Sequence, residues 1–233
     1  MKLGTPALSY RILGYVEKER IYKINMSSVS VFCCFRSCLD NFSFSPTVPL
    51  VPKENPIQLD TAFMGYEVVI VKGGQRVCGT GAALGNAPLV QSKSYFEVKI
   101  QQSGSWSIGI ATRQTDLSLS LGGMDEFSWV LGHDHIIRHN KQELHKINIC
   151  NNSDNNGMQT IQEGDIIGVA FDHIQLKFFL NGKEIEQSIS NVKGTVYPAL
   201  YVDDGAILDI ILDNFKHSPP SGFDKIMLEQ SLL

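Results

Sequence analysis

Residues 165–186 of the chain read DIIGVAFDHIQLKFFLNGKEIE. Short apolar segments alternate in this stretch with two turn dipeptides, Asp172-His173 and Asn181-Gly182. Asn-Gly between apolar segments is the strongest short-range signal for a β-hairpin, because both residues tolerate the left-handed backbone of a tight turn. The stretch therefore predicts antiparallel strands joined by tight turns.

The surrounding segments show the same pattern of short apolar stretches separated by turn residues. Residues 94–101, SYFEVKIQ, alternate with a period of two, which places Phe96 on one face of a strand and Glu97 on the other. Further strands fit residues 67–80, 196–202 and 206–212. No segment of this region keeps a helical periodicity, which favours an all-β fold in the form of an antiparallel β-sandwich.

The composition limits the class of protein. At 233 residues and 25.8 kDa, the chain is long enough for one large all-β domain and a tail, and 43% hydrophobic residues suffice for a core. A net charge of −4 without a clustered basic face argues against a nucleic-acid partner. No apolar run approaches the ~18 residues that a membrane span needs. We expect a monomer without a cofactor.

The chain divides into three zones. Residues 1–25 have no related pattern later in the sequence and are interpreted as an N-terminal extension of doubtful origin. Met26 is a second plausible start, and we expect the main cellular product to begin there. Residues 26–56 are rich in cysteine and proline and are predicted to be a mostly unstructured tail. All periodic apolar segments lie in residues 57–233, which are assigned to the folded domain.

The cysteines bear on location and modification. Their number, five, is odd, which indicates free thiols in a reducing compartment. Residues 1–25 lack a secretory signal, so we expect a cytoplasmic protein with access to the nucleus. Cys33, Cys34 and Cys38 have aromatic and basic neighbours, which suits S-acylation and a lipid-mediated membrane association. The alternative is a tail whose thiols are not modified.

Six segments match, in order, the SPRY family, the sandwich also found at the ends of tripartite-motif and butyrophilin proteins. They are SYFEVKI (94–100), GSWSIGIAT (104–112), LGGMDEFSWVL (121–131), GDIIGVAFD (164–172), LKFFLNG (176–182) and VYPALYV (196–202). The resemblance covers roughly Ile57 to Phe223. It implies a jelly-roll-like sandwich that binds proteins through its loops and has no catalytic residues. Trp106 and Trp129 are then expected to fill the space between the sheets.

Two other patterns resemble chemical sites. Gly79–Gly85 is glycine-rich, but its spacing misses the dinucleotide fingerprint by one residue and Pro88 would end a following helix almost at once. His133 and His135 fall in an expected turn and His139 on the returning strand. We expect a solvated turn here rather than a zinc site, because no cysteine pair has suitable spacing. No catalytic motif is present, so we do not expect an enzyme.

The resemblance places binding in loops at one end of the sandwich. Three candidate loops follow: residues 82–89 with Asn86; residues 113–121 with Arg113, Gln114, Asp116 and Leu117; and the turn Asp203, Asp204 and Gly205. The best-understood peptide-binding members have an aromatic residue in the third loop, where this chain has two aspartates. Charge complementarity then favours a basic or hydroxyl-rich protein or peptide. The alternative is that the aspartates merely solvate a turn.

Two classes of function stay open. The first is a non-catalytic adaptor that recognises a protein or peptide. The second is a small-ligand or glycan-binding sandwich, because related folds host both functions. A concave pocket lined by aromatic residues at the loop end would favour the second class, and a flat loop surface would favour the first.

Overall fold

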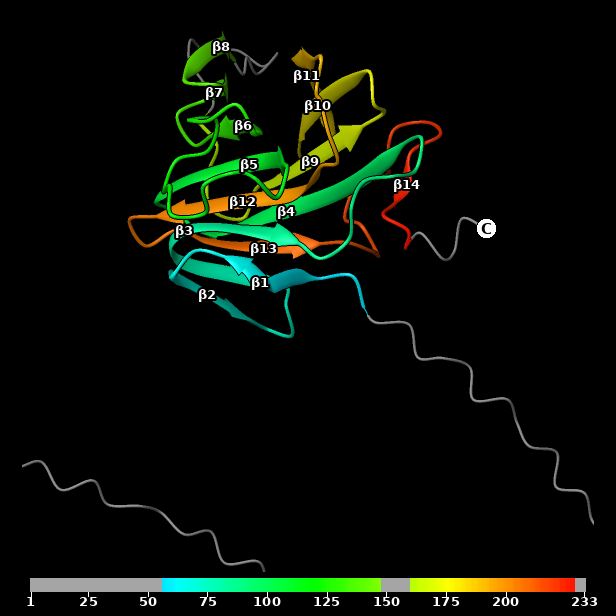
Figure 1. Cartoon of the computed structure of the whole chain (residues 1–233). Coiled ribbons are helices and arrows are strands. Elements are labelled where there is room, and N and C mark those ends of the chain that lie inside the picture. Colours follow the sequence, from blue (N-terminus) through cyan, green and yellow to red (C-terminus); the bar gives the residue numbers. More distant parts are fainter. Residues whose placement is uncertain (1–55, 148–159, 229–233) are drawn as a thin grey trace, which may run out of the picture. The chain divides into compact units, whose positions relative to one another are not determined.

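The computed structural model describes residues 56–147 and 160–228, which form strands in two packed sheets (Figure 1). The strands are β1 (Leu59–Met64), β2 (Glu67–Val71), β3 (Arg76–Gly85), β4 (Ser94–Gln102), β5 (Ser105–Ala111), β6 (Ser128–Gly132), β7 (Ile136–His139), β8 (Gln142–Lys146), β9 (Ile166–Phe171), β10 (Gln175–Leu180), β11 (Lys183–Ser190), β12 (Tyr197–Asp203), β13 (Ile207–Ile211) and β14 (Asp224–Lys225). The tail with Cys33, Cys34, Cys38 and Met26 lies outside the described residues, so the predictions made for it stay untested.

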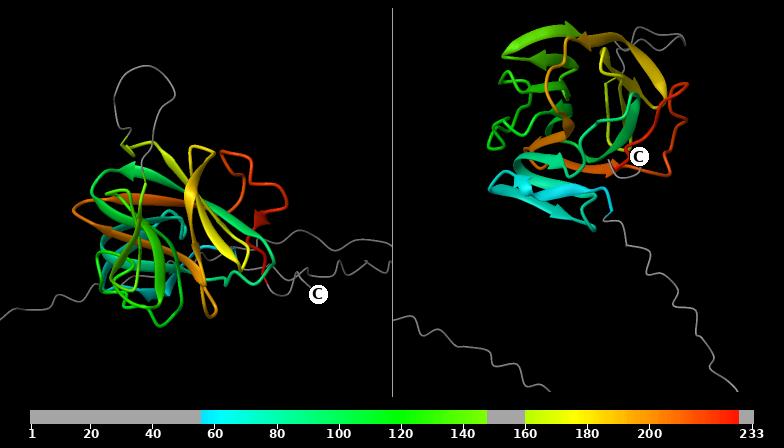
Figure 2. Two further views of the ribbon diagram at one scale, coloured as in Figure 1. Left: turned by 90° about the horizontal axis from the view of Figure 1, so that it is seen from above. Right: turned by 45° about the vertical axis from the view of Figure 1, so that its right-hand side comes forward.

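The sheets are antiparallel, as the sequence predicts, except for one short parallel pairing of β14 with β4. Sheet A has the order β1-β3-β12-β5-β6-β7-β8. Sheet B has the order β2-β3-β13-β4-β9-β10-β11. The hairpin at Asn181-Gly182 is confirmed, since Leu180 pairs with Lys183 across it. The right-hand view of Figure 2 shows the two layers, with β1 and β2 in cyan at the lower border.

Strand β3 belongs to both sheets. Its first half pairs with β2 and β13 in sheet B, and its second half pairs with β1 and β12 in sheet A. The change of sheet falls at Gly79 and Gly81, whose φ angles are +98° and +125°. A side chain at Gly79 would also collide with the carbonyl oxygen of Glu67. The glycines of the Gly79–Gly85 stretch therefore serve this crossing, and the stretch leads into no helix.

The main core lies between the sheets. Trp106 and Trp129 are both buried there, 2% and 3% exposed, as expected from the sequence. A second apolar cluster, with Tyr201 at its centre, covers the other face of sheet A under the segment that follows β5. A third cluster joins Tyr95 on β4 to Phe179 and Phe215 on the other face of sheet B. Both sheets are thus covered on their outer faces over part of their area.

Candidate functional site

The turn Asp203-Asp204-Gly205 connects β12 in sheet A with β13 in sheet B. Asp204 and Gly205 both have left-handed backbones, with φ of +48° and +78°, and the N–H of Ala206 donates to the Asp203 carbonyl at 2.9 Å. Asp followed by Gly is suited to this conformation, because both residues tolerate positive φ. The local sequence therefore explains the turn.

The two aspartates turn to different neighbours. The Thr80 hydroxyl donates to Asp203 Oδ1 at 3.0 Å, and the Ser105 hydroxyl donates to Asp204 Oδ2 at 2.8 Å. Hydrogen bonds from the Asp204 N–H and the Thr80 hydroxyl hold the pKa of Asp203 below its usual range. Neither carboxylate forms an ion pair with any lysine, arginine or histidine of the described residues. The turn therefore presents negative charge that hydroxyl and backbone N–H groups support, without an ion-pair partner among the described residues.

The loop of residues 113–121 reaches this turn through its second half. Ser120 lies close enough to Asp203 to help lower the pKa of its carboxyl, and the Leu117 carbonyl accepts from the Ala82 N–H at 2.9 Å where β3 crosses between the sheets. Asp116 closes its own turn by accepting from the Ser118 N–H at 2.9 Å. The structure thus brings the second and third candidate loops together at one end of sheet A.

Asp125 anchors this loop, and sequence reasoning missed it. Its carboxylate accepts hydrogen bonds from Thr115 Oγ1 at 2.7 Å, Ser128 Oγ at 2.7 Å and the Asp116 N–H at 3.0 Å. Burial alone would raise the pKa of Asp125, but these bonds outweigh it and lower the pKa. A local pattern could have identified it. Aspartate commonly accepts a hydrogen bond from the N–H two residues later in a turn, and Asp125 accepts from the Phe127 N–H in this way at 3.0 Å.

Arg113 lies at the opposite end of β12. Its guanidinium is 3.9 Å from the ring centroid of Phe63 and 4.7 Å from that of Tyr197, and 3.6 Å from a carboxylate oxygen of Asp60. Tyr197 and Asp203 begin and end β12, which places them about 20 Å apart. Arg113 and the acidic turn therefore belong to different ends of the domain, contrary to the single loop cluster expected from the sequence.

The first candidate loop differs most from the prediction. Residues 82–85 are the end of β3 and are buried, because β1 and β12 pair with them on both sides. Asn86 follows, and its side chain accepts from the Gln58 N–H and donates to the Pro56 carbonyl, both at 3.0 Å. Asn86 therefore fastens the segment before β1, and the binding role predicted for it stays a prediction.

A cleft of about 600 Å³ opens near the Arg113 end. Gln114, which is exposed, lines it together with Trp129, His139 and Lys193. His139 lies on β7 as predicted, and its ring stacks on Trp129 with 4.6 Å between centroids. His139 therefore covers the indole on the side of the cleft.

The other two histidines do not share one environment. His133 is exposed and sits against the edge of Trp106. His135 is only 8% exposed and accepts from the Ile161 N–H through Nε2 at 3.1 Å, so the expected solvated turn is wrong for this residue. Among the residues that the structure describes, no group of acidic, histidine and cysteine side chains could hold a metal ion.

His135 should make stability depend on pH. Burial lowers its pKa from the usual 6.5, so the unfolded chain takes up a proton near that pH while the folded chain does so only at lower pH. Stability is therefore lost as the pH falls through this window. In His135→Asn, the free energy of unfolding measured with urea should change less between about pH 7.5 and about pH 5.5 than in the wild type. His145→Asn, at an exposed position, should behave like the wild type; an equal slope in both variants would contradict the prediction.

The fold and the comparisons define the class of protein. The SPRY domain model matches residues 93–215, and the chain belongs to the SPRY domain family. Members of this family are generally non-catalytic interaction modules. Among the described residues, no helix is long and apolar enough to cross a membrane.

Related proteins narrow the comparison within this family. The chain is 46% identical over 206 residues to SPRY domain-containing protein 7 of Bos taurus and of Homo sapiens, covering 88% of this chain and 99% of each relative. Two solved structures share the fold. The SPRY domain of human HERC1 has a TM-score of 0.53 at 14% identity, covering 68% of this chain and 99% of that one. The TRIM65 PSpry domain has a TM-score of 0.52 at 13% identity, covering 68% and 90%.

Proposed function

We propose that the domain is a cytoplasmic, non-catalytic adaptor that binds a basic or hydroxyl-rich protein segment at the end formed by Asp203, Asp204, Gly205 and the neighbouring loop around Ser120. The observation that carries the proposal is the pair of carboxylates that accept from the Thr80 and Ser105 hydroxyls and have no ion-pair partner among the described residues. A cationic ligand would supply the missing countercharge.

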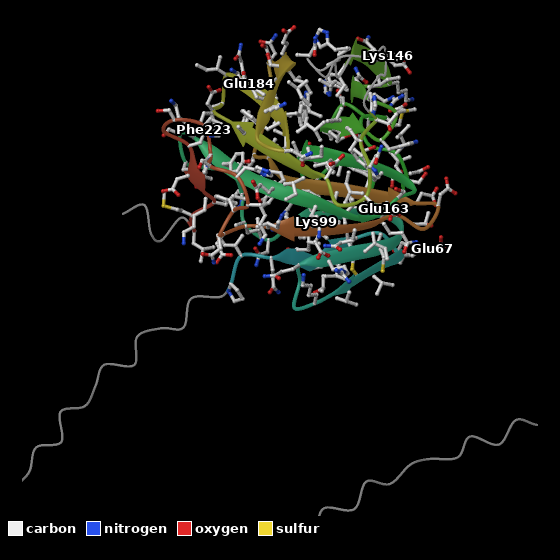
Figure 3. The ribbon with its side chains drawn as sticks, turned by 180° about the vertical axis from the view of Figure 1, so that it is seen from behind. Glu67, Lys99, Lys146, Glu163, Glu184 and Phe223 are labelled. Atoms are coloured by element: carbon white, nitrogen blue, oxygen red, sulfur yellow. The ribbon has the colours of Figure 1, made fainter. Side chains whose placement is uncertain are left out.

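Other acids stand near this turn. Glu67 pairs in register with Thr80, and Glu163 accepts from the Ser103 N–H at 2.8 Å, beside Gln102, whose side chain donates to the Gly205 carbonyl at 2.9 Å. Figure 3, which views the fold from behind, shows Glu67 and Glu163 toward the same side of the molecule. Their fields add to that of the turn, and would attract a positively charged segment before contact.

The test replaces Asp203 and Asp204 with asparagine, which keeps size and polarity and removes two charges. Binding of the full chain to synthetic Lys- and Ser-rich peptides is measured by fluorescence anisotropy. Exposed charge pairs contribute about 0.2–1 kcal/mol each and desolvated pairs more, so the double variant should bind at least several-fold more weakly. High salt should weaken the wild-type complex more than the variant complex.

The matched control removes two charges elsewhere, by Asp213→Asn together with Glu186→Gln, both at exposed positions. It should bind like the wild type, and all three proteins should have melting temperatures within a few degrees. If the Asp203 and Asp204 variant keeps its affinity and its salt dependence, the acidic turn is not the binding site.

The small-ligand alternative has one observation in its favour. The cleft beside Gln114 is lined in part by Phe127, Trp129 and Leu144, and its volume of about 600 Å³ is in the range of ligand pockets. However, Trp129 is 3% exposed and covered by His139, so no open indole face is available for a sugar ring. If the variant without the charges of Asp203 and Asp204 still binds a ligand, this cleft becomes the candidate binding site.

A further inference from the structure

The turn between β1 and β2 lies at the same end of the domain as the acidic turn. The Ala82 carbonyl on β3 accepts from the Gly65 N–H at 2.9 Å, and the Ala82 N–H donates to the Leu117 carbonyl at 2.9 Å. Gly65 also begins the turn, because its carbonyl accepts from the Val68 N–H at 3.1 Å. The turn between β1 and β2 therefore lies next to the loop of residues 113–121. Both this turn and the acidic turn lie at the left of the fold in Figure 1.

A row of polar side chains connects the two turns. Glu67 on β2 pairs in register with Thr80 on β3, and the Thr80 hydroxyl donates to Asp203 at 3.0 Å. Neighbouring strands lie about 4.8 Å apart, so the backbones of Glu67 and Asp203 are about 10 Å apart. Glu67, like Asp203 and Asp204, forms no ion pair with any described residue. Three carboxylates without a countercharge therefore lie within reach of one ligand side chain.

Tyr66 adds an aromatic ring to these carboxylates. It occupies the corner of the turn directly before Glu67, and its side chain is fully exposed. Its ring contacts no other ring and no cation among the described residues. Tyrosine is enriched at the centres of binding surfaces, because it supplies a large contact area and has only two χ angles to immobilise. The exposed ring is therefore suited to contact a ligand.

The domain itself shows which cation suits an aromatic ring beside a carboxylate. At the other end of β12, the Arg113 guanidinium lies 3.9 Å from the ring centroid of Phe63 and 3.6 Å from a carboxylate oxygen of Asp60. A guanidinium is planar, so its face packs on a ring while the N–H groups at its edge donate to carboxylates. A lysine ammonium has no such face, and it is more strongly hydrated. Arginine is therefore the side chain that best uses both kinds of group.

We propose that Tyr66 is the aromatic contact of the binding end, where its ring stacks on an arginine side chain of the partner segment while Glu67 and Asp203 accept from the guanidinium. This inference rests on the proposed function. It narrows the ligand from a basic or hydroxyl-rich segment to a segment that contains arginine.

Two labelled peptides test the inference by fluorescence anisotropy with the full chain. They share a Ser- and Gly-rich sequence and differ only in that one has arginines where the other has lysines. The wild type should bind the arginine peptide about three- to tenfold more tightly. Tyr66→Ala should lose most of this preference, whereas Tyr66→Phe keeps the ring and should retain it. Ile174→Ala is the matched control, because it removes another exposed apolar side chain, on the turn between β9 and β10, and it should bind like the wild type.

The outcomes separate this inference from the proposed function. Suppose that Asp203→Asn together with Asp204→Asn weakens the binding of both peptides, while Tyr66→Ala binds the arginine peptide as tightly as the wild type does. The acidic turn then binds the ligand and the stacking on Tyr66 is wrong. Equal affinity of the wild type for the two peptides also overturns the inference, and so does loss of the preference in Tyr66→Phe. If the wild type binds neither peptide, or if removing the two aspartate charges changes neither affinity, the proposed function fails and the inference fails with it.

Discussion

Replacing Trp106 with alanine is expected to lower the free energy of unfolding by about 3–5 kcal/mol, as emptied aromatic core sites do. Trp106 lies on β5, is 2% exposed and packs in the main core between the two sheets. The sheets cannot close over the vacated space without moving their paired strands, so a cavity remains. Urea unfolding followed by circular dichroism measures the loss.

The control is Tyr66→Ala, which removes an aromatic side chain that is fully exposed. Its effect on the free energy of unfolding should stay within about 0.5 kcal/mol. If the urea midpoint of Trp106→Ala moves no further than that of Tyr66→Ala, the indole does not support the core in the way its burial indicates.

The fold could be predicted because its signals are local. Asn181-Gly182 specifies a hairpin through the backbone preferences of two residues, and the period of two in residues 94–101 specifies a strand through its own side chains. The exchange of β3 between the sheets was not predicted. The glycines at 79 and 81 are compatible with a loop as well as with a crossing, and only the pairing of β3 with four strands distinguishes them.

The candidate site was predicted in part, for a similar reason. The turn at Asp203 and Asp204 follows from local residue preferences, and the loop that carries Ser120 lies beside it. The placement of Arg113 was missed, because the side chain stacks on Phe63 and Tyr197, which are distant in sequence. Tyr197 and Asp203 lie at opposite ends of β12, so a residue that contacts one of them is far from the other. The sequence alone does not say which loop lies at which end of the strand.

Glu97 is a second residue whose surroundings depend on a segment distant in sequence. The period of two correctly places it on the face opposite Phe96, but that face is not open to solvent at this point. Residues 213–217, more than a hundred positions later, cross over it, and Glu97 is 0% exposed. Its carboxyl oxygens accept from the Lys216 N–H at 2.7 Å, the His217 N–H at 2.9 Å and the Tyr95 hydroxyl at 3.2 Å. A buried acid with these partners fixes the C-terminal segment to β4.

Glu97→Ala is therefore expected to cost about 3–5 kcal/mol, because it leaves the Tyr95 hydroxyl and two part-buried backbone N–H groups without their acceptor. Glu97→Gln keeps the shape and one acceptor oxygen, and should cost less, about 1–3 kcal/mol. Hydrogen exchange separates this local role from general destabilisation. The amide protons of Lys216 and His217 should exchange faster in both variants, under conditions where the amides of β9 and β10 remain protected. Unchanged exchange at Lys216 and His217 in Glu97→Ala would mean that the segment is fastened by Phe215 against Tyr95, whose ring centroids are 4.9 Å apart, and not by the carboxyl group.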